Sequence, residues 1–291
     1  MKAPTAPMIE TRDIETAPGL VFDCSVGGDA SAPLVLMLHG FCVSRYFWDS
    51  QIPVLAASGY FAVAPNQRGY AAGARPDPAD LDSYRIDKLI GDANDIVTAL
   101  GHGDRRVHVV GHDWGGSLAW IIADRGPERI ASLAMLSRPH PASFARALKI
   151  DPEQPHRSRH HQELLDPGAG QRLLAENGKW VRDRLARNGV PGEAIEKHLS
   201  VIGNPPAMEA ALPGIALAAS ARQSAPPGCR PCSSGARLMT RLAASRPKGR
   251  PNSSRRITAF VPLPCVGHYA ADQVPAQVNK LLLDHLTRHP V

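Results

Sequence analysis

The stretch from Val107 to Trp120 reads VHVVGHDWGGSLAW, which is a buried strand, a sharp turn and a helix in immediate succession. Gly111 and Gly115 lie two residues on either side of Asp113. Small residues at these positions let a strand double back into a helix without clashes, so we expect the Asp113 side chain to be held exposed in a strained turn. The simpler alternative is that Asp113 only caps the following helix.

Strand and helix patterns alternate through the first half of the chain. IETRDIET and LVFDCSVG alternate like antiparallel strands, and four buried strands follow, in PLVLMLHG, YFAVAPNQRG, VHVVGHDWGG and IASLAMLSRPHP. Helical patterns lie between them, as in SYRIDKLIGDANDIVTALG. This alternation predicts the α/β class, with a mostly parallel sheet covered by helices on both faces.

From Ala142 to about Leu212 the strand patterns stop, and the sequence indicates helices broken by Pro and Gly. An all-helical insert after the fourth parallel strand predicts a cap over the carboxyl edge of the sheet, where open α/β sheets bind ligands. We therefore expect a core of residues 1–141 and 258–291, a helical cap of 142–212, and an aberrant, poorly ordered segment of 213–257.

The aberrant segment explains the charge of the chain. The net charge is +6, but nine of the 33 Lys and Arg lie between Pro213 and Cys265, where there is no Asp or Glu. The other 24 basic residues face 27 acidic ones, a balance of −3. A basic block of this kind can indicate nucleic-acid binding. We favour a different origin, translation out of frame, so no nucleic-acid partner is expected.

Two further motifs complete a constellation around Asp113. HGF (His39, Gly40, Phe41) follows the first parallel strand, and GHY places His268 late in the chain. The amides of Phe41 and Trp114 are the expected oxyanion hole, since Trp114 begins a helix whose N-terminus favours negative charge. His268 is the expected general base.

These motifs resemble the epoxide hydrolase-like branch of the α/β-hydrolase fold family. The resemblance rests on GHDWGG, HGF, NQRGY (Asn66–Tyr70) and GHYAADQ, and covers roughly residues 10–212 and 260–290. GHDWGG is also similar to haloalkane dehalogenases, in which the Trp after the Asp contacts the halide. The resemblance implies an α/β-hydrolase fold, a small apolar epoxide or haloalkane as substrate, and no cofactor or metal.

An acid at the nucleophile position suits such reactions. Asp113 is ionised at neutral pH if its pKa is near the usual value of about 3.9. It can attack an sp³ carbon directly and form an alkyl ester. His268 is then free to activate the water that hydrolyses this ester, while the two amides stabilise the oxyanion of that step.

The chain departs from the family at the proton donors and at the third triad residue. The family has two cap tyrosines, but none of the five tyrosines lies in residues 142–212. His160 stands where one of them would fall and is a possible proton donor. The triad acid should follow a later strand in a W-G-x-x-D pattern, and the corresponding CSSGARLMTR contains no acid. In serine enzymes the analogous loss costs about 10⁴ in rate. Asp272, four residues after His268, is expected to start a helix and not to replace this acid.

Both losses fit one hypothesis, that the chain from about Pro213 to Phe260–Cys265 is read out of frame. Regrouped codons can restore W-Y-R and W-G-x-x-D, and Met239 followed by Thr240 must contain G-A-C, a codon for Asp. The alternative is a natural basic insertion. Cys229 and Cys232 could be half a metal site, but no second pair is evident and chance explains them better.

Three functions remain open at this level: an epoxide hydrolase-like enzyme, a haloalkane dehalogenase-like enzyme, and a damaged, non-catalytic family member. The apolar run PLVLMLHGF is too short to span a bilayer, and no leader peptide is evident, which favours a cytoplasmic protein without membrane contact. The five cysteines do not suggest a disulfide framework. Substrate identity and oligomeric state are not predicted.

Overall fold

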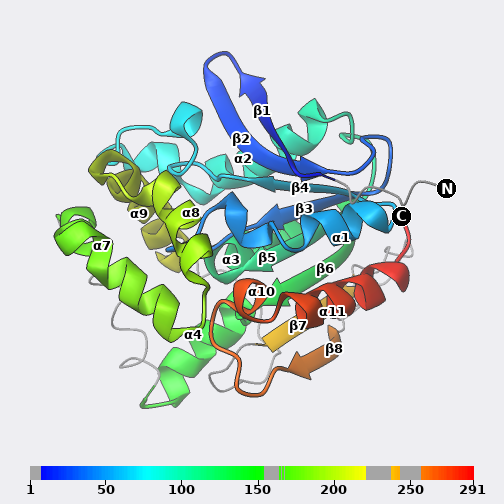
Figure 1. The fold of residues 1–291 in the computed structure, drawn as a ribbon. Helices are drawn as coiled ribbons and strands as arrows, with labels where there is room; N and C mark the ends of the chain where they lie inside the picture. Colours follow the sequence, from blue (N-terminus) through cyan, green and yellow to red (C-terminus); the bar gives the residue numbers. More distant parts are fainter. Residues whose placement is uncertain (1–7, 154–163, 165, 167, 221–236, 243–256) are drawn as a thin grey trace.

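An eight-stranded sheet with helices on both faces forms the described part of the chain (Figure 1). The computed structural model describes residues 8–153, 164, 166, 168–220, 237–242 and 257–291. The strand order is β1-β2-β4-β3-β5-β6-β7-β8. The strands are β1 Glu10–Ala17, β2 Leu20–Gly27, β3 Leu34–Leu38, β4 Phe61–Pro65, β5 Val107–His112, β6 Ile130–Leu136, β7 Arg237–Leu242 and β8 Ile257–Pro262.

The central strands pair in parallel, from β4 through β3 and β5 to β6, as the sequence predicts. Every residue of these four strands is buried, which explains their continuous apolar sequences. The predicted antiparallel strands are also confirmed, since β1 pairs with β2, and β2 joins the sheet antiparallel to β4.

Helices cover the two faces and the carboxyl edge of the sheet. On the faces lie α1 Ile52–Ala57, α2 Ile86–Ala99, α3 Asp113–Arg125 and α11 Pro275–Thr287 (Figure 1). Four helices, α4 Pro141–Ile150, α7 Ala169–Arg187, α8 Gly192–Ile202 and α9 Pro205–Ser220, gather on one side of the sheet, and the short α10 Ala270–Gln273 precedes α11. The 3₁₀ turns are η1 Arg45–Trp48, η2 Ala72–Ala74, η3 Leu81–Tyr84 and η4 Pro127–Arg129.

The structure corrects the expected end of the helical pattern near Leu212. The helix α9 continues through Pro213 to Ser220. An internal proline normally removes one backbone hydrogen bond and clashes with the preceding turn. Here the surrounding Ala and Leu residues favour helix, and Ala211, Leu212 and Ile215 are buried in the core. Tertiary packing therefore maintains the helix across the proline.

The edge of β6 is covered by two strands from the segment that the sequence predicted to be poorly ordered or to follow it. β7 pairs antiparallel with β6, and β8 pairs antiparallel with β7. A buried strand such as β6 needs partners for its backbone N–H and C=O groups, and β7 supplies them. Two reversals make β8 parallel to β6. The chain therefore leaves β8 at the carboxyl edge of the sheet, shortly before His268.

No helix among the described residues is long and apolar enough to cross a membrane. The segments 221–236 and 243–256, which include most of the basic block and Cys229 and Cys232, lie outside the described residues, as does His160.

Candidate active site

The turn between β5 and α3 holds Asp113 in a left-handed backbone conformation, with φ of 48°. Such values are costly for residues other than glycine and concentrate at functional sites. The neighbouring glycines permit the turn. A Cβ on Gly111 would lie 2.6 Å from Cα of Gly116, and one on Gly115 would lie 2.3 Å from the carbonyl oxygen of Leu38. Neither position has room for a side chain, so the two glycines let the strand turn directly into the helix.

The Asp113 carboxylate contacts groups from three other parts of the chain. Its Oδ1 accepts a hydrogen bond from the backbone N–H of Phe41 at 3.3 Å. Its Oδ2 lies 3.5 Å from Nε2 of His268 and 3.8 Å from Nη1 of Arg138. These partners lie outside α3, and among the described residues the hydrogen bond that the carboxylate accepts from a backbone amide comes from Phe41, not from the first turn of that helix. The geometry does not support the helix-cap alternative.

Backbone hydrogen bonds fix the position of His268. Its N–H donates to Oδ1 of Asn188 at 3.0 Å. Its carbonyl oxygen lies 3.0 Å from Nε2 of His112 and accepts from Oγ of Ser137 at 2.8 Å. The side chain, 30% exposed, directs Nε2 at Asp113. Within the described residues no side chain hydrogen-bonds to its Nδ1, so no acid of that part of the chain orients the ring.

Asp272 is engaged elsewhere. It is the third residue of α10, and its Oδ2 lies 3.2 Å from Nε2 of His198 in α8. The Nδ1 of His198 accepts from the backbone N–H of Ser44 at 3.2 Å, and the Ser44 hydroxyl lies 3.1 Å away. His198 thus ties the segment after Phe41 to the segment after His268. Asp272 serves this connection and does not contact His268.

The surroundings of Asp113 favour its ionised form. Burial alone would raise the pKa of this carboxyl group. The hydrogen bond and charge of His268 and the charge of Arg138 oppose burial and hold the pKa well below 3.8. Burial also lowers the pKa of His112 to about 3 and of His39 to about 4, so both rings are neutral near pH 7.

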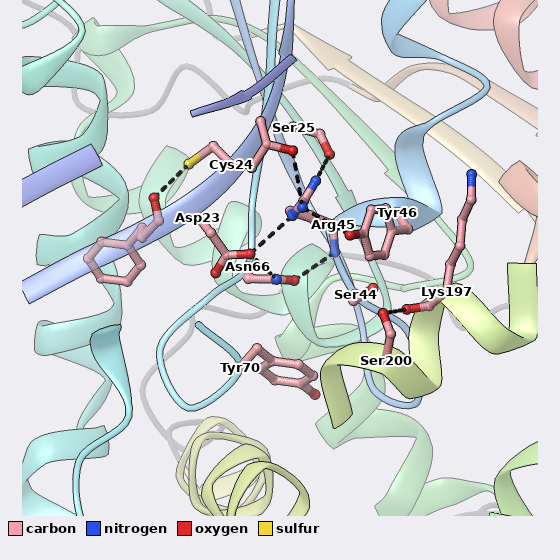
Figure 2. Close-up of polar contacts among 12 residues, drawn as sticks. Asp23, Cys24, Ser25, Ser44, Arg45, Tyr46, Asn66, Tyr70, Lys197 and Ser200 are labelled. Carbon is pink, nitrogen blue, oxygen red and sulfur yellow. Dashed lines mark hydrogen bonds and ion pairs between the residues drawn. The ribbon is translucent and has the colours of Figure 1, made fainter. Parts of the chain in front are cut away.

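A buried polar network fastens the chain that follows Phe41 (Figure 2). The guanidinium of Arg45 donates from Nε to Oδ2 of Asp23 at 3.1 Å and from Nη2 to Oη of Tyr46 at 3.0 Å. The Arg45 N–H donates to Oδ1 of Asn66 at 2.9 Å, and Asn66 Nδ2 donates to Asp23 Oδ2 at 2.7 Å. Asn66 belongs to the NQRGY motif. This motif therefore anchors the loop that presents the Phe41 amide.

Replacing Arg45 by Met should lower the free energy of unfolding by about 2–3 kcal/mol, because Asp23 loses its cationic partner and Ser25 its donor. Asp23 is 31% exposed and can be partly rehydrated, which keeps the loss below that of a fully buried pair. Urea unfolding followed by circular dichroism measures it. Arg105→Met, on an exposed arginine that donates only to a backbone carbonyl, is the control and should change the value little.

A small, open pocket lies between the core and α9. Asp113 itself is not among its lining residues, but Trp114 and His39, next to Asp113 and Gly40, are. The full lining is His39, Gln67, Arg68, Tyr70, Ile86, Leu89, Trp114, Leu118, Ala211, Gly214 and Ile215. Its wall is mainly apolar.

Comparison with known proteins finds relatives of part of this chain. A family model described as "alpha/beta hydrolase fold" matches residues 33–166. The AB hydrolase superfamily protein YfhM of Bacillus subtilis is 34% identical over 166 residues, which cover 57% of either chain. Epoxide hydrolase A of Mycobacterium tuberculosis is 36% identical over 200 residues, or 66% of this chain and 58% of that protein. The fold is therefore that of the α/β hydrolases, and curated relatives of part of this chain are named epoxide hydrolases.

A solved structure extends the likeness. Epoxide hydrolase VrEH1 from Vigna radiata superposes on this chain with a TM-score of 0.58 at 25% identity, covering 74% of this chain and 75% of that one. The alignments to the two curated relatives span 57% and 58% of their lengths.

Among the site residues predicted from sequence, the structure brings Asp113, Phe41 and His268 together, and it places Trp114 second in α3 and in the pocket wall. His160 lies outside the described residues. Sequence reasoning missed Arg138, which pairs with Asp113, and His198. Arg138 lies in SRPHP directly after a predicted buried strand, and that position at the carboxyl edge was a signal that could have found it.

Proposed function

We propose that this hydrolase opens small epoxides through an alkyl ester on Asp113. The observation that carries the proposal is the set of contacts of one carboxylate, with Oδ1 on the Phe41 amide and Oδ2 facing His268. A nucleophile held by an oxyanion donor on one oxygen and a base on the other has the arrangement that covalent hydrolysis requires.

In the first step a lone pair of the Asp113 carboxylate forms a bond to a ring carbon. The ring C–O bond breaks, its electron pair stays on the former ring oxygen, and that oxygen takes a proton. His160 remains the candidate donor, with water as the default source. This step needs no proton transfer to His268, because Asp113 is ionised beforehand.

In the second step His268 removes a proton from water, and the resulting hydroxide attacks the ester carbonyl. The Phe41 amide, already on Oδ1, stabilises the oxyanion, and we assign the second amide to Trp114. Collapse of this intermediate breaks the ester C–O bond, the departing alkoxide takes the proton from His268 and leaves as the diol, and Asp113 loses its proton to solvent, which returns the carboxylate. We also propose that α4, α7, α8 and α9 form the cap over this site.

The rate of ester formation should be constant from about pH 5 to pH 8. The pKa of Asp113 is lowered, so its carboxylate persists throughout this range and is lost only as the pH falls through that low folded-state pKa. The lowered pKa of Asp113 also stabilises the folded chain above pH 3.8. This stabilisation is lost as the pH falls from 3.8 through the folded-state pKa. Rapid-quench rates at four pH values test this, and a rate that falls tenfold between pH 8 and pH 5 would mean that another group must be deprotonated first.

A single turnover in ¹⁸O-labelled water tests the proposed function. Excess enzyme is mixed with an epoxide, and the diol and the Asp113 peptide are analysed by mass spectrometry. An ester on Asp113 predicts an unlabelled diol and ¹⁸O in Asp113, because water attacks the carboxyl carbon. Label in the diol and none in Asp113 would show direct attack by water and refute the ester.

Haloalkane hydrolysis is the second candidate, favoured by the Trp114 side chain in the pocket wall directly after the nucleophile. Here halide leaves with the electron pair of the C–X bond, and no proton donor is needed. Halide release from a short haloalkane, without turnover of epoxides, would select this function. A cooperative thermal transition without turnover of epoxides, haloalkanes or aryl esters would instead favour the third hypothesis, a damaged family member that folds but does not catalyse a reaction.

A further inference from the structure

Arg138 is a buried cation beside the nucleophile. It is 8% exposed and follows β6 at the carboxyl edge of the sheet. Its guanidinium lies 4.9 Å from the ring centre of Trp114 and 5.4 Å from that of Phe144. A Cβ on Gly116 would lie 2.9 Å from Cβ of Arg138, so a glycine there makes room for the side chain.

The hydrogen-bonding capacity of Arg138 is largely unused within the described residues. Its Nε donates to Oγ of Ser117 at 2.6 Å. Its contact with Asp113, 3.8 Å between Nη1 and Oδ2, is an ion pair that is longer than a hydrogen bond. Nη2 bonds to no described residue, although a guanidinium offers five N–H donors in a planar fork that matches a carboxylate.

The reaction proposed above removes the counter-ion of Arg138. When Asp113 becomes an ester it is neutral, and a buried guanidinium without an anion is strongly disfavoured. An anionic group on the substrate would compensate Arg138 both before and after the ester forms. A neutral substrate leaves Arg138 uncompensated for as long as the ester persists.

A second arginine, Arg184, is connected through Tyr269 to the loop that presents the Phe41 amide. Arg184 of α7 donates from Nε to Oη of Tyr269 at 3.2 Å, and this hydroxyl lies 3.5 Å from the carbonyl oxygen of Phe41, the residue whose amide holds Oδ1 of Asp113. Tyr269 is neutral near pH 7, since burial raises the pKa of its phenol well above 10. Arg138 and Arg184 thus both interact electrostatically with the Asp113 carboxylate.

We propose that this site takes electrophiles bearing a carboxylate next to the reactive carbon, and that Arg138 holds this carboxylate. The substrate class is then 2,3-epoxy acids or 2-halo acids. The inference rests on the proposed function for its chemistry, because attack by Asp113 breaks the C–O or C–X bond as described above. The preference of Arg138 for a carboxylate can be measured without turnover.

The test is binding of an unreactive pair, phenylacetate and phenylacetamide, by isothermal titration calorimetry. The acid should bind at least about tenfold more tightly than the amide, because only the acid forms a charge-assisted, forked pair with a guanidinium. Arg138→Met should remove this preference. Arg125→Met, on an exposed arginine at the end of α3, should keep it.

Asp113→Asn gives a sharper outcome, because it copies the neutral charge of the ester. Without its counter-ion, Arg138 should bind phenylacetate more tightly than it does in the wild type, whereas phenylacetamide should be unaffected. A general basic patch elsewhere on the chain would not respond to this substitution.

The proposal is overturned if the wild type binds the amide as tightly as the acid, or if Arg138→Met keeps the preference while its thermal transition shows a folded protein. If the Met variant does not fold, Arg138→Gln replaces it in the same binding test. Ester formation is a separate readout. Carboxylate binding that needs Arg138, with no Asp113 ester from any electrophile, would refute the proposed function and leave this inference standing. If neutral epoxides form the ester and the acid binds no more tightly than the amide, this inference is refuted and the proposed function stands.

Discussion

Excess epoxide is expected to convert the protein to its Asp113 ester much faster than the ester is hydrolysed, so that the intermediate accumulates. Ester formation needs only the ionised carboxylate, which the site favours. Hydrolysis needs His268 as a base, and no acid among the described residues orients its ring. The undescribed segments between Pro213 and Cys265 contain no Asp or Glu that could do so. By analogy with serine enzymes, the second step should be slower by about 10⁴ than in a complete triad.

Rapid-quench sampling followed by intact-protein mass spectrometry measures both steps. The expected time course is a fast rise to about one adduct per chain, followed by slow decay. His268→Gln should leave the rise unchanged and slow the decay further. Decay as fast as the rise in the wild type would show that the missing acid does not limit the reaction.

Placing an acid at Ser137 is expected to accelerate decay of the ester, by up to about 10² of the 10⁴ lost. Ser137 follows β6, and its Oγ reaches the His268 backbone at 2.8 Å. Its φ is 55°, a left-handed conformation that Asp tolerates better than most residues. Ser137→Asp therefore brings a carboxylate to the His268 side of the site without a new backbone conformation.

The matched control is Ser137→Asn, which has the same shape and backbone preference but no charge. Both variants are assayed for ester decay after rapid removal of free epoxide. Faster decay in the Asp variant alone supports the missing-acid account. Equal decay in the two variants would mean that the acid is not what the second step lacks.

The central sheet and the turn at Asp113 could be predicted because each is encoded locally. Continuous apolar runs give the four parallel strands, and glycines around Asp113 give the turn. His268 could be predicted because its motif, GHY, follows the GHDWGG and HGF motifs in the order expected for a nucleophile and its base. These features depend on residues that are near one another in sequence or on motifs of fixed order.

Arg138 and the strands β7 and β8 depend on residues distant in sequence, and the sequence pattern missed them. An arginine between prolines resembles a solvated loop residue, and its burial follows from Gly116, Trp114 and Phe144. RLMTRL shows little periodic pattern, and its pairing is set by the open edge of β6. The path of α9 through Pro213 likewise results from tertiary packing that overrides local propensity.

The central claim is that Asp113 is the residue that becomes esterified. The most direct measurement is peptide mapping by mass spectrometry of the protein quenched during reaction with an epoxide. We predict one adduct on the peptide that contains Asp113, and none at all in Asp113→Asn. An adduct on another residue, or an equal yield from Asp113→Asn, would contradict the account.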